Sequence, residues 1–332
     1  MPGLGHKSEL RFGKETTFGG GATPTHKLEI VRANFPPDVG VLQDQALYNG
    51  VSRRGLYQGG FLVRGTFVVR MNYDGMLELF RGIWGSGVSA VVGGETIVRD
   101  HTMKEASTLP SYEIQAGIGD VPTGRSFRLL GAKFVNAKIA GTAGQGVDAM
   151  LQAEVTVLAK DMTSDFTPTG SAAFPAILPV LYHQASGATG VVDDGTADSG
   201  VRVRQFEVTL EQPHTEDRFY MGSVNIDEPL RSDFLTARWR LVQEFQTKTQ
   251  YDAARAFTVG SPRLVFAHPT TIGTGSKREF ELRSNQANIV EWGAPVEGFG
   301  VILSTVQFEA FQDPTDVTAL LARFRNLEAA IV

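Results

Sequence analysis

Cysteine is absent from the 332 residues of this chain. Its absence excludes disulfide bonds, thiolate zinc sites, iron–sulfur clusters and cysteine nucleophiles together, and it suits synthesis in a reducing cytoplasm. Histidine and carboxylate side chains remain as metal ligands, but no two of the six histidines have the i, i+4 spacing of a helical metal site. The sequence therefore predicts neither a metal site nor a cofactor.

Long hydrophobic runs are also missing. The most apolar stretch, from Ala172 to Tyr182, is interrupted by Pro175 and Pro179 and falls well short of the ~20 residues that a membrane-spanning helix needs. Charged side chains occupy the first positions, where a secretory signal peptide has an apolar core. We therefore expect no membrane insertion and no secretion by that route.

A basic surface is not indicated either. The net charge is −5, and the acidic excess lies in the part of the chain beyond Phe166. Proteins that grip nucleic acid do so with clustered Lys and Arg, so this balance argues against tight binding to phosphate. It is compatible with a surface past which DNA slides without sticking.

No motif points to catalysis. Asp100 beside His101 is the one close acid–imidazole pair, and a solvated loop pair is its commoner meaning. The glycine-rich segment 117–124 matches a phosphate-binding loop only in part and is not followed by a helix signal, so a hairpin turn is expected. Two adjacent carboxylate pairs lack calcium-loop spacing and are expected to be acidic turns, Asp193-Asp194 and Asp227-Glu228. The sequence predicts a protein that is not an enzyme.

The 37 glycines, the 20% of charged residues and the dominance of Phe among the aromatic residues favour a mainly β protein with many turns. Residues 1–60 are punctuated by Gly19-Gly20-Gly21 and Pro36-Pro37 and predict an extended arm with loops. Residues 61–332 predict one β domain, interrupted at 184–200 by a flexible loop rich in Gly, Ser and Asp.

Alternation of polar and apolar residues is clearest over 201–313. From Val203 to Glu211, the polar residues Gln205, Glu207, Thr209 and Glu211 share one face, and Arg204, Phe206, Val208 and Leu210 share the other. Leu235 to Phe245 alternates in the same way, with Trp239 on the apolar face and Arg238, Arg240 and Glu244 opposite it. Further strands are expected at 61–71, 111–118, 126–139, 147–159, 263–267, 278–283, 289–291 and 301–311.

Helix signals follow two of these strands. One helix is expected to begin at Asn72 or Asp74, to end at Gly85 and to bury the stripe Met76, Leu77, Phe80, Ile83 and Trp84. A second is expected at 248–256 and a third at 316–331. The order of a strand followed by a helix therefore occurs in both halves of the chain, although the two halves share negligible sequence identity.

A family resemblance rests on the order of these segments. Residues 206–257, followed by RLVFAH, REFELRS and GFGVILSTVQFEAFQD, resemble the tail tube protein of long, non-contractile phage tails, and the opening GKETTFGGGATPT is similar to the start of such proteins. The resemblance implies an antiparallel β-sandwich or barrel with a flanking helix and a long N-terminal arm. It also implies self-assembly in the virion tail into stacked, usually six-fold rings that form a conduit for DNA ejection.

The resemblance implies partners as well: further copies of the chain, a tape measure protein, tail-end proteins, and viral DNA that passes without specific binding. The sequence leaves open whether a ring is six-fold or a three-fold pseudo-hexamer. On this hypothesis the candidates for the channel wall are Glu207, Glu211, Glu154 and Glu244, all at polar strand positions that could equally be ordinary solvent-facing sites. Candidates for contacts between subunits are Arg238, Arg240, Asp227 and Glu228.

Two other functions stay open. Another self-assembling virion component, a tail terminator or a capsid shell protein, would share the missing cysteine and the cytoplasmic synthesis, although the long helix usual in shell proteins is not indicated. A carbohydrate-binding β-sandwich module would need exposed aromatic platforms. Of the three tryptophans, Trp84 and Trp239 are expected to be buried.

Overall fold

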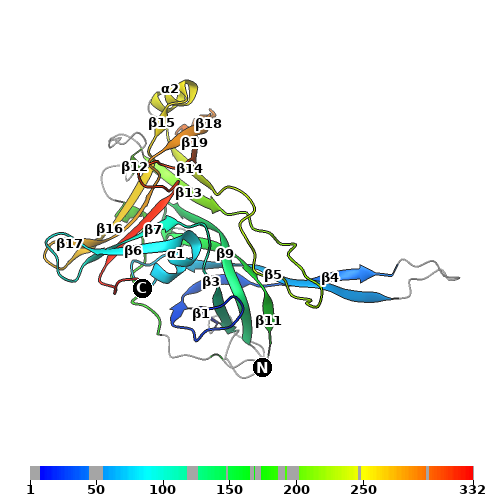
Figure 1. Cartoon of the computed structure of the whole chain (residues 1–332). Helices are drawn as coiled ribbons and strands as arrows, with labels where there is room; N and C mark the ends of the chain where they lie inside the picture. Colours follow the sequence, from blue (N-terminus) through cyan, green and yellow to red (C-terminus); the bar gives the residue numbers. More distant parts are fainter. Residues whose placement is uncertain are drawn as a thin grey trace.

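The structure is a computed structural model that describes residues 8–44, 55–117, 126–146, 149–164, 168, 173–185, 191–192, 202–245, 248–296 and 299–331. It is mainly β, with 55% strand and 7% helix. Two antiparallel sheets pack face to face, and in the described residues they do not close into a barrel (Figure 1). The expected sandwich-like fold with flanking helices is confirmed.

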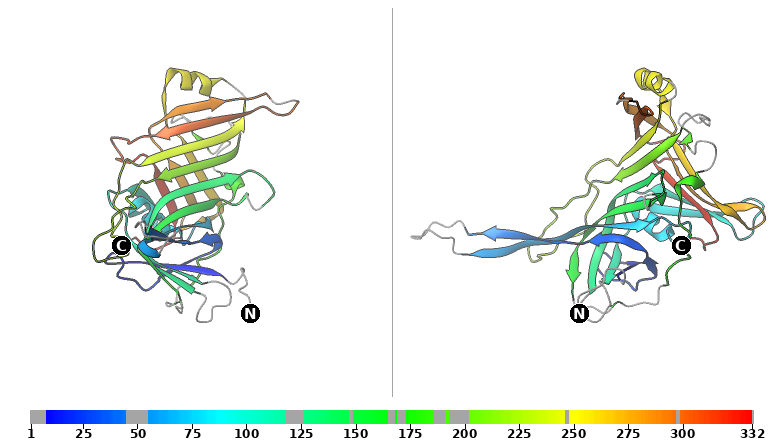
Figure 2. Two further views of the ribbon diagram at one scale, coloured as in Figure 1. Left: turned by 90° about the vertical axis from the view of Figure 1, so that its right-hand side faces the viewer. Right: turned by 180° about the vertical axis from the view of Figure 1, so that it is seen from behind.

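The larger sheet is one antiparallel ladder that runs the length of the molecule. The left view of Figure 2 looks onto its strands, with the second sheet behind them. From one end to the other its strands are β3 (Ile30–Asn34), β5 (Leu56–Arg70), β10 (Gln152–Ala159), β9 (Ser126–Thr142), β13 (Val203–Glu211), β14 (Thr236–Glu244), β19 (Leu303–Ala310), β18 (Ala287–Gly293) and β15 (Val259–Gly260).

Five further strands branch off this ladder: one pairs with β5, two pair with β9, and the last two are attached through one of these. They are β1 (Glu9–Lys14), β2 (His26–Leu28), β4 (Pro37–Gln43), β8 (Tyr112–Gly117) and β11 (Asp161–Thr163). The second sheet, called here the outer sheet, has the order β12 (Val191–Val192), β16 (Arg263–Ile272), β17 (Ser276–Arg283), β20 (Leu321–Asn326), β7 (Arg99–Glu105) and β6 (Gly85–Val91). A 3-10 turn covers Tyr182–Gln184.

The core lies between the two sheets because the alternating apolar residues of each sheet face the other. Trp84 and Trp239 are 0% and 1% exposed, which confirms the expected burial of both. Phe80 packs edge-on against Phe280 and Phe324 of the outer sheet at ring-centroid distances of 5.7 and 4.8 Å. Burial of such aromatic side chains is the main force that holds the sheets together.

Helix α1 (Leu77–Trp84) buries the predicted stripe and ends at Gly85, whose φ of +93° is the left-handed conformation that glycine favours. It starts later than expected, at the N-cap Met76. Asp74 is instead held by Arg278, with Arg278 Nε 3.0 Å from a carboxylate oxygen. Helix α2 (Thr249–Ala256) lies at the far end of the large sheet, against β18, and confirms the predicted short helix (Figure 1).

The expected helix at 316–331 is wrong. Residues Leu321–Asn326 instead form β20, at the centre of the outer sheet between β17 and β7. Ala322 and Phe324 point into the core, while Arg323 and Arg325 pair with acidic residues of the neighbouring strands. Neighbouring strands on both edges therefore decide the structure of this segment. Strands β6 and β7 were not expected from the sequence.

The described part of residues 1–60 forms β1 to β4 and the start of β5. Strand β1 is integrated into the sheet, with Leu10 and Phe12 fully buried. Strands β4 and β5 form a long hairpin that projects from the body on the side away from the outer sheet (Figure 1). Of the predicted loop 184–200, residues 184, 185, 191 and 192 are described, and the rest lies outside the described residues, as does the pair Asp193-Asp194.

Candidate functional site

One face of the large sheet is polar and is not covered by the outer sheet. On β13 the residues Phe206, Val208 and Leu210 are buried, and the residues between them are partly exposed. The same alternation on β14, β10 and β19 places the polar residues of four strands of the ladder on one surface. We call this surface the polar face. All four candidate wall residues, Glu154, Glu207, Glu211 and Glu244, lie on it.

Two of these glutamates pair with basic residues of other strands in the ladder. Lys138 Nζ on β9 lies 2.7 Å from Glu207 Oε2 on β13. Arg32 Nη2 on β3 lies 3.1 Å from Glu154 Oε2 on β10. Both pairs are partly solvent-exposed, so each contributes little to stability, about 0–1 kcal/mol. Their main effect is to neutralise the carboxylates at the surface.

Glu211 and the two candidate arginines on β14, Arg238 and Arg240, lie on the polar face as well. Arg238 lies between Glu211 and Glu309, with nitrogen to oxygen distances of 3.7 and 3.6 Å. Arg240 is directly opposite Glu207 in the β13–β14 ladder. The arginines that the sequence suggested as subunit contacts therefore lie among the proposed wall residues.

The contacts of Glu244 show an error in the alternation predicted for β13. Arg204 was expected on the apolar face, but the β13–β14 register shifts between Val203 and Gln205, which turns Arg204 outward. Its Nη2 lies 2.5 Å from Glu244 Oε1, and Arg202 Nη1 lies 3.8 Å from the other oxygen of the same carboxylate. A β-bulge adds one residue to a strand and reverses the side-chain direction beyond it, so strict alternation fails there.

These pairs make the polar face a surface of interleaved opposite charges. It has no uniform acidic field, because each candidate glutamate has an Arg or Lys within 4 Å. The partners Arg32, Lys138 and Glu309 were missed from the sequence. Lys138 and Glu309 occupy polar positions of alternating strands and could have been found, whereas Arg32 lies in a segment without readable periodicity.

Asp227 and Glu228 pair within the chain. Lys133, only 2% exposed, places its Nζ 2.7 Å from Glu228 Oε1 and 3.0 Å from the carbonyl oxygen of Pro229. Arg218 Nη2 lies 3.4 Å from Asp227 Oδ2. The Lys133 contacts fasten the long β13–β14 connection, residues 212–235, to β9, and the Arg218–Asp227 pair lies within the connection.

Buried titratable groups elsewhere have structural partners. Asp100 binds Arg325 through both carboxylate oxygens, at 2.7 and 2.9 Å, while its neighbour His101 points the other way and contacts Ser89 Oγ through Nδ1 at 2.8 Å. Burial lowers the pKa of His101, so the imidazole is neutral at pH 7. The expected solvated loop pair is wrong, because both residues lie in strand β7 and His101 is fully buried. The described residues contain no group of three or more His, Asp or Glu that could hold a metal ion.

Comparison with models of known protein families gives a match. A model of the phage tail tube protein family matches residues 5–310, nearly the whole chain. The chain belongs to the phage tail tube protein family. The resemblance read from the sequence is thereby confirmed, and a structural role in the virion tail, within a tube of many subunits, follows from membership.

No curated protein matches the chain. Among the described residues, no helix is both long enough and apolar enough to cross a membrane. The tail tube family is structural, in keeping with the absence of catalytic motifs from the sequence.

Proposed function

We propose that this tail tube protein assembles side by side into rings, that the rings stack into a tube, and that the polar face of the large sheet lines the channel through which DNA is ejected. The observation that carries the proposal is the division of one long ladder into two faces. One face is buried against the outer sheet. The other is polar and charge-paired, and no second layer covers it in the described part of the chain.

A charge-paired wall suits the passage of DNA. Unpaired Lys and Arg would hold phosphates and release counterions, which is the main source of non-specific DNA affinity. A uniformly acidic wall would instead repel the duplex on entry. With Arg238 held by Glu211 and Glu309, and Lys138 by Glu207, the field of each charge is reduced by its partner. DNA then neither binds strongly nor is strongly excluded.

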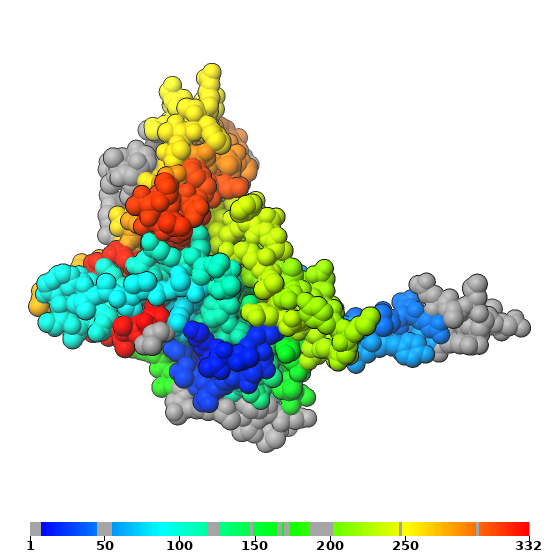
Figure 3. Space-filling model, viewed as in Figure 1, coloured from blue at the N-terminus to red at the C-terminus, as the bar shows by residue number. Residues whose placement is uncertain are grey.

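Stacking of rings has a candidate element in the β4–β5 hairpin. Figure 3 shows it protruding far beyond the body, with residues 212–235 around its base. The two segments are joined there, since Phe61 N–H donates to Val224 O at 2.7 Å and Ile226 N–H donates to Phe61 O at 3.2 Å. The hairpin exposes apolar side chains that a partner would cover, Val39, Val41, Leu42, Leu56 and Tyr57. On this proposal the hairpin contacts a neighbouring ring.

Family membership suggests the remaining partners. The assembled tube would enclose a tape measure protein and would end on tail-end proteins, and the loop 184–200 would contact neighbouring subunits. The first two partners rest on the family alone, and the contact by the loop rests on its composition, rich in Gly, Ser and Asp.

Electron microscopy of the purified chain over a range of concentrations tests the proposal. We expect rings at moderate concentration and hollow tubes at high concentration, with a central channel wide enough for a DNA duplex. A chain that stays monomeric at every concentration and salt condition, or filaments without a channel, would contradict it.

A further inference from the structure

The two halves of the chain repeat one topology. In chain order the first half contains β3, β5, α1, β9 and β10, and the second contains β13, β14, α2, β18 and β19. In the large sheet these strands stand in the order β3-β5-β10-β9, followed by β13-β14-β19-β18. Both halves thus place their first, second, fourth and third strands side by side, all antiparallel, with a helix between the second and third.

The helices of the two halves match in detail. Each has eight residues. Each ends at a residue in the left-handed conformation, Gly85 with φ +93° and Phe257 with φ +52°. Each also packs against the third strand of its own half, α1 against β9 and α2 against β18.

Irregularities in the ladders match as well. In the first strand of each half, one extra residue interrupts the pairing with the second strand, Val31 in β3 and Arg204 in β13. In the third strand, an extra residue interrupts the pairing with the fourth, Val135 in β9 and Val290 in β18. Bulges are specific features of a fold, so four at equivalent places indicate a structural repeat even without sequence identity.

The halves meet in an internal seam between β9 and β13. Residues 136–142 of β9 pair antiparallel with residues 205–211 of β13, so the third strand of one half pairs with the first strand of the next. The Lys138–Glu207 ion pair crosses this seam on the polar face. A repeating unit that joins its successor in this way leaves the same two edges free at its ends.

Those two edges are free in the described structure. On β18, strand β15 covers Ala287 and Asn288 only, and among the described residues no strand pairs with that edge from Ile289 onward. At the other end, β3 has β5 on one edge and no described strand on the other. Each end exposes apolar residues, among them Val290 and Val296 at 53% and 73%, and Val31 at 53%.

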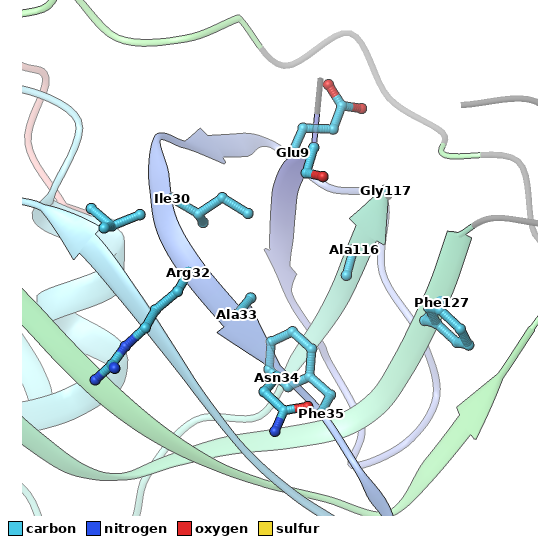
Figure 4. Close-up of a pocket in the computed structure, with 11 residues that line it drawn as sticks. Glu9, Ile30, Arg32, Ala33, Asn34, Phe35, Ala116, Gly117 and Phe127 are labelled. Carbon is cyan, nitrogen blue, oxygen red and sulfur yellow. The ribbon is translucent and has the colours of Figure 1, made fainter. Parts of the chain in front are cut away.

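A pocket lies beside the free edge of β3. It has a volume of about 490 Å³, and Figure 4 shows Ile30, Ala33 and Phe35 around it together with Ala116 and Phe127. Glu9, Arg32 and Asn34 also line it. The apolar part of this lining, next to an unpaired strand, is suited to receive the edge of another sheet.

Helix α1 is covered by the second half of the chain, whereas α2 lacks a corresponding cover in the described part of the chain. This difference is expected if α2 is covered by another copy. The second half covers the end of α1, where Trp84 Nε1 donates to Leu320 O at 2.7 Å and Gln212 Nε2 donates to Ile83 O. Helix α2 has no equivalent cover among the described residues, and Tyr251 and Phe257 are 43% and 64% exposed. The first half of another copy would stand where the second half stands beside α1.

We infer that the chain is a tandem of two ring positions, and that β18 of one copy pairs antiparallel with β3 of the next. In a ring with the six positions that the family resemblance implies, three copies then close the ring. The inference rests on the proposed ring assembly. A heterologous contact repeated by rotation closes in this way and leaves no free sheet edge.

The internal seam also gives the register. When the two halves are aligned by their bulges, Ala140 corresponds to Pro295 and Glu207 corresponds to Asn34. The seam pair Ala140–Glu207 therefore places Pro295 of one copy opposite Asn34 of the next. Hydrogen bonds in the seam link Ala143 with Arg204 and Gln212 with Val135, so the Ala140–Glu207 pair occupies a non-hydrogen-bonded position. A proline is tolerated at such a position because no N–H is needed from it.

Engineered disulfides test this register cleanly because the chain has no cysteine of its own. Opposite residues at a non-hydrogen-bonded position have Cα atoms about 4.5 Å apart, within the range of a disulfide. The test variant carries Asn34→Cys and Pro295→Cys. The internal control carries Ala140→Cys and Glu207→Cys, the equivalent pair inside one chain. The mismatched control carries Asn34→Cys and Val296→Cys, because Val296 is one residue out of the inferred register and successive residues of an extended chain face opposite sides.

Assembled samples are oxidised, denatured and run without reductant. We expect the test variant to give covalent species of two and three chains and none larger, the internal control to stay a single cross-linked chain, and the mismatched control to show at least tenfold less linkage. Rings of the unmodified chain should have the mass of three chains, which checks the stoichiometry without any substitution.

Three results would overturn the inference in distinguishable ways. A covalent ladder up to six chains, or a ring mass of six chains, means that each chain fills one position. Tubes in which the test pair stays unlinked while the internal control links mean that another edge closes the ring. Failure of the unmodified chain itself to form rings or tubes overturns the proposed function, and the inference with it.

Discussion

Lys138 on β9 and Glu207 on β13 are joined by an ion pair of 2.7 Å that links the two halves of the chain on the polar face. The same surface contains Arg238 between Glu211 and Glu309. Charge pairing thus extends across the seam and along the neighbouring strands. In the proposed channel wall, basic residues such as Arg238 and Lys138 are neutralised by acidic residues, among them the candidate wall residues Glu207 and Glu211.

Adding positive charge to this wall should make the tube retain DNA. Glu207→Lys with Glu211→Lys removes two exposed ion pairs, which costs each subunit about 1 kcal/mol or less, so tubes should still form. Every subunit then adds unpaired cations to the channel, and DNA affinity should rise at low salt and fall steeply as salt is added. Binding of a short labelled duplex to sedimented tubes measures the effect.

The matched control for this change carries Thr270→Lys with Thr271→Lys, which puts the same residues on exposed positions of β16 in the outer sheet. It should bind clearly less DNA inside the tube than the wall variant. Equal DNA retention by both variants would mean that retention depends on the net charge of the subunit, wherever that charge lies, and that the polar face does not line the channel.

Removing apolar side chains from the hairpin should impair stacking and spare the subunit. Leu42 and Tyr57 are directly paired between β4 and β5, and each is 60% exposed. Replacing both with Ser should change the free energy of unfolding by about 0.5 kcal/mol or less, because little buried contact is lost. Tube lengths in electron micrographs should become several-fold shorter.

Val88→Ser is the control for this prediction. Val88 is 67% exposed on β6, in the outer sheet, so it tests the loss of an exposed apolar residue elsewhere. Tubes of normal length from the hairpin variant, or equally short tubes from the control, would contradict a role for the hairpin in stacking.

Much of the fold could be predicted because its strands alternate. Phe206, Val208 and Leu210 gave the buried face of β13 directly, and the stripe that includes Phe80 and Trp84 gave the buried face of α1. Such patterns are local, since each residue needs only its neighbours in sequence to show which way it points.

The predictions that were wrong or missing concern residues whose structure depends on partners distant in sequence. The segment around Leu321 and Phe324 contains residues that also favour helices, and it becomes β20 because β17 and β7 supply backbone partners on both edges. Arg204 turned outward because of a bulge, which alternation cannot reveal. Arg32 reached Glu154 through the pairing of β3 with β5, in a segment whose glycines and prolines concealed the strand.

Lys133 should prove essential for holding the β13–β14 connection. Its ammonium is buried and contacts Glu228 and the carbonyl oxygen of Pro229. Lys133→Ala removes these contacts and leaves a cavity, and should lower the free energy of unfolding by about 2–3 kcal/mol. Lys133→Met, which keeps the length of the side chain, should cost less. Urea denaturation of both variants checks the order, and equal losses would show that packing of the stem is unimportant.

The Asp100–Arg325 pair should make stability depend on pH. Burial opposes ionisation of Asp100, but hydrogen bonds and charge from Arg325 and Arg323 outweigh it and hold the pKa of this carboxyl below its usual range. Because the folded-state pKa lies below the unfolded value of about 3.9, the carboxylate stabilises the fold above that pH, and this contribution is lost as pH falls through the folded-state pKa.

Asp100→Asn should therefore lower the free energy of unfolding by about 2 kcal/mol at pH 7, where the native carboxylate is charged and paired. The difference between the unmodified chain and the variant should shrink below about pH 4, because protonation removes the same charge from the unmodified chain. Urea denaturation at pH 7 and near pH 3 measures both values, with Asp217→Asn, an exposed carboxylate, as the control. A difference of equal size at both pH values would show that Asp100 acts through its shape and hydrogen bonds alone, since only the contribution of its charge can vanish on protonation.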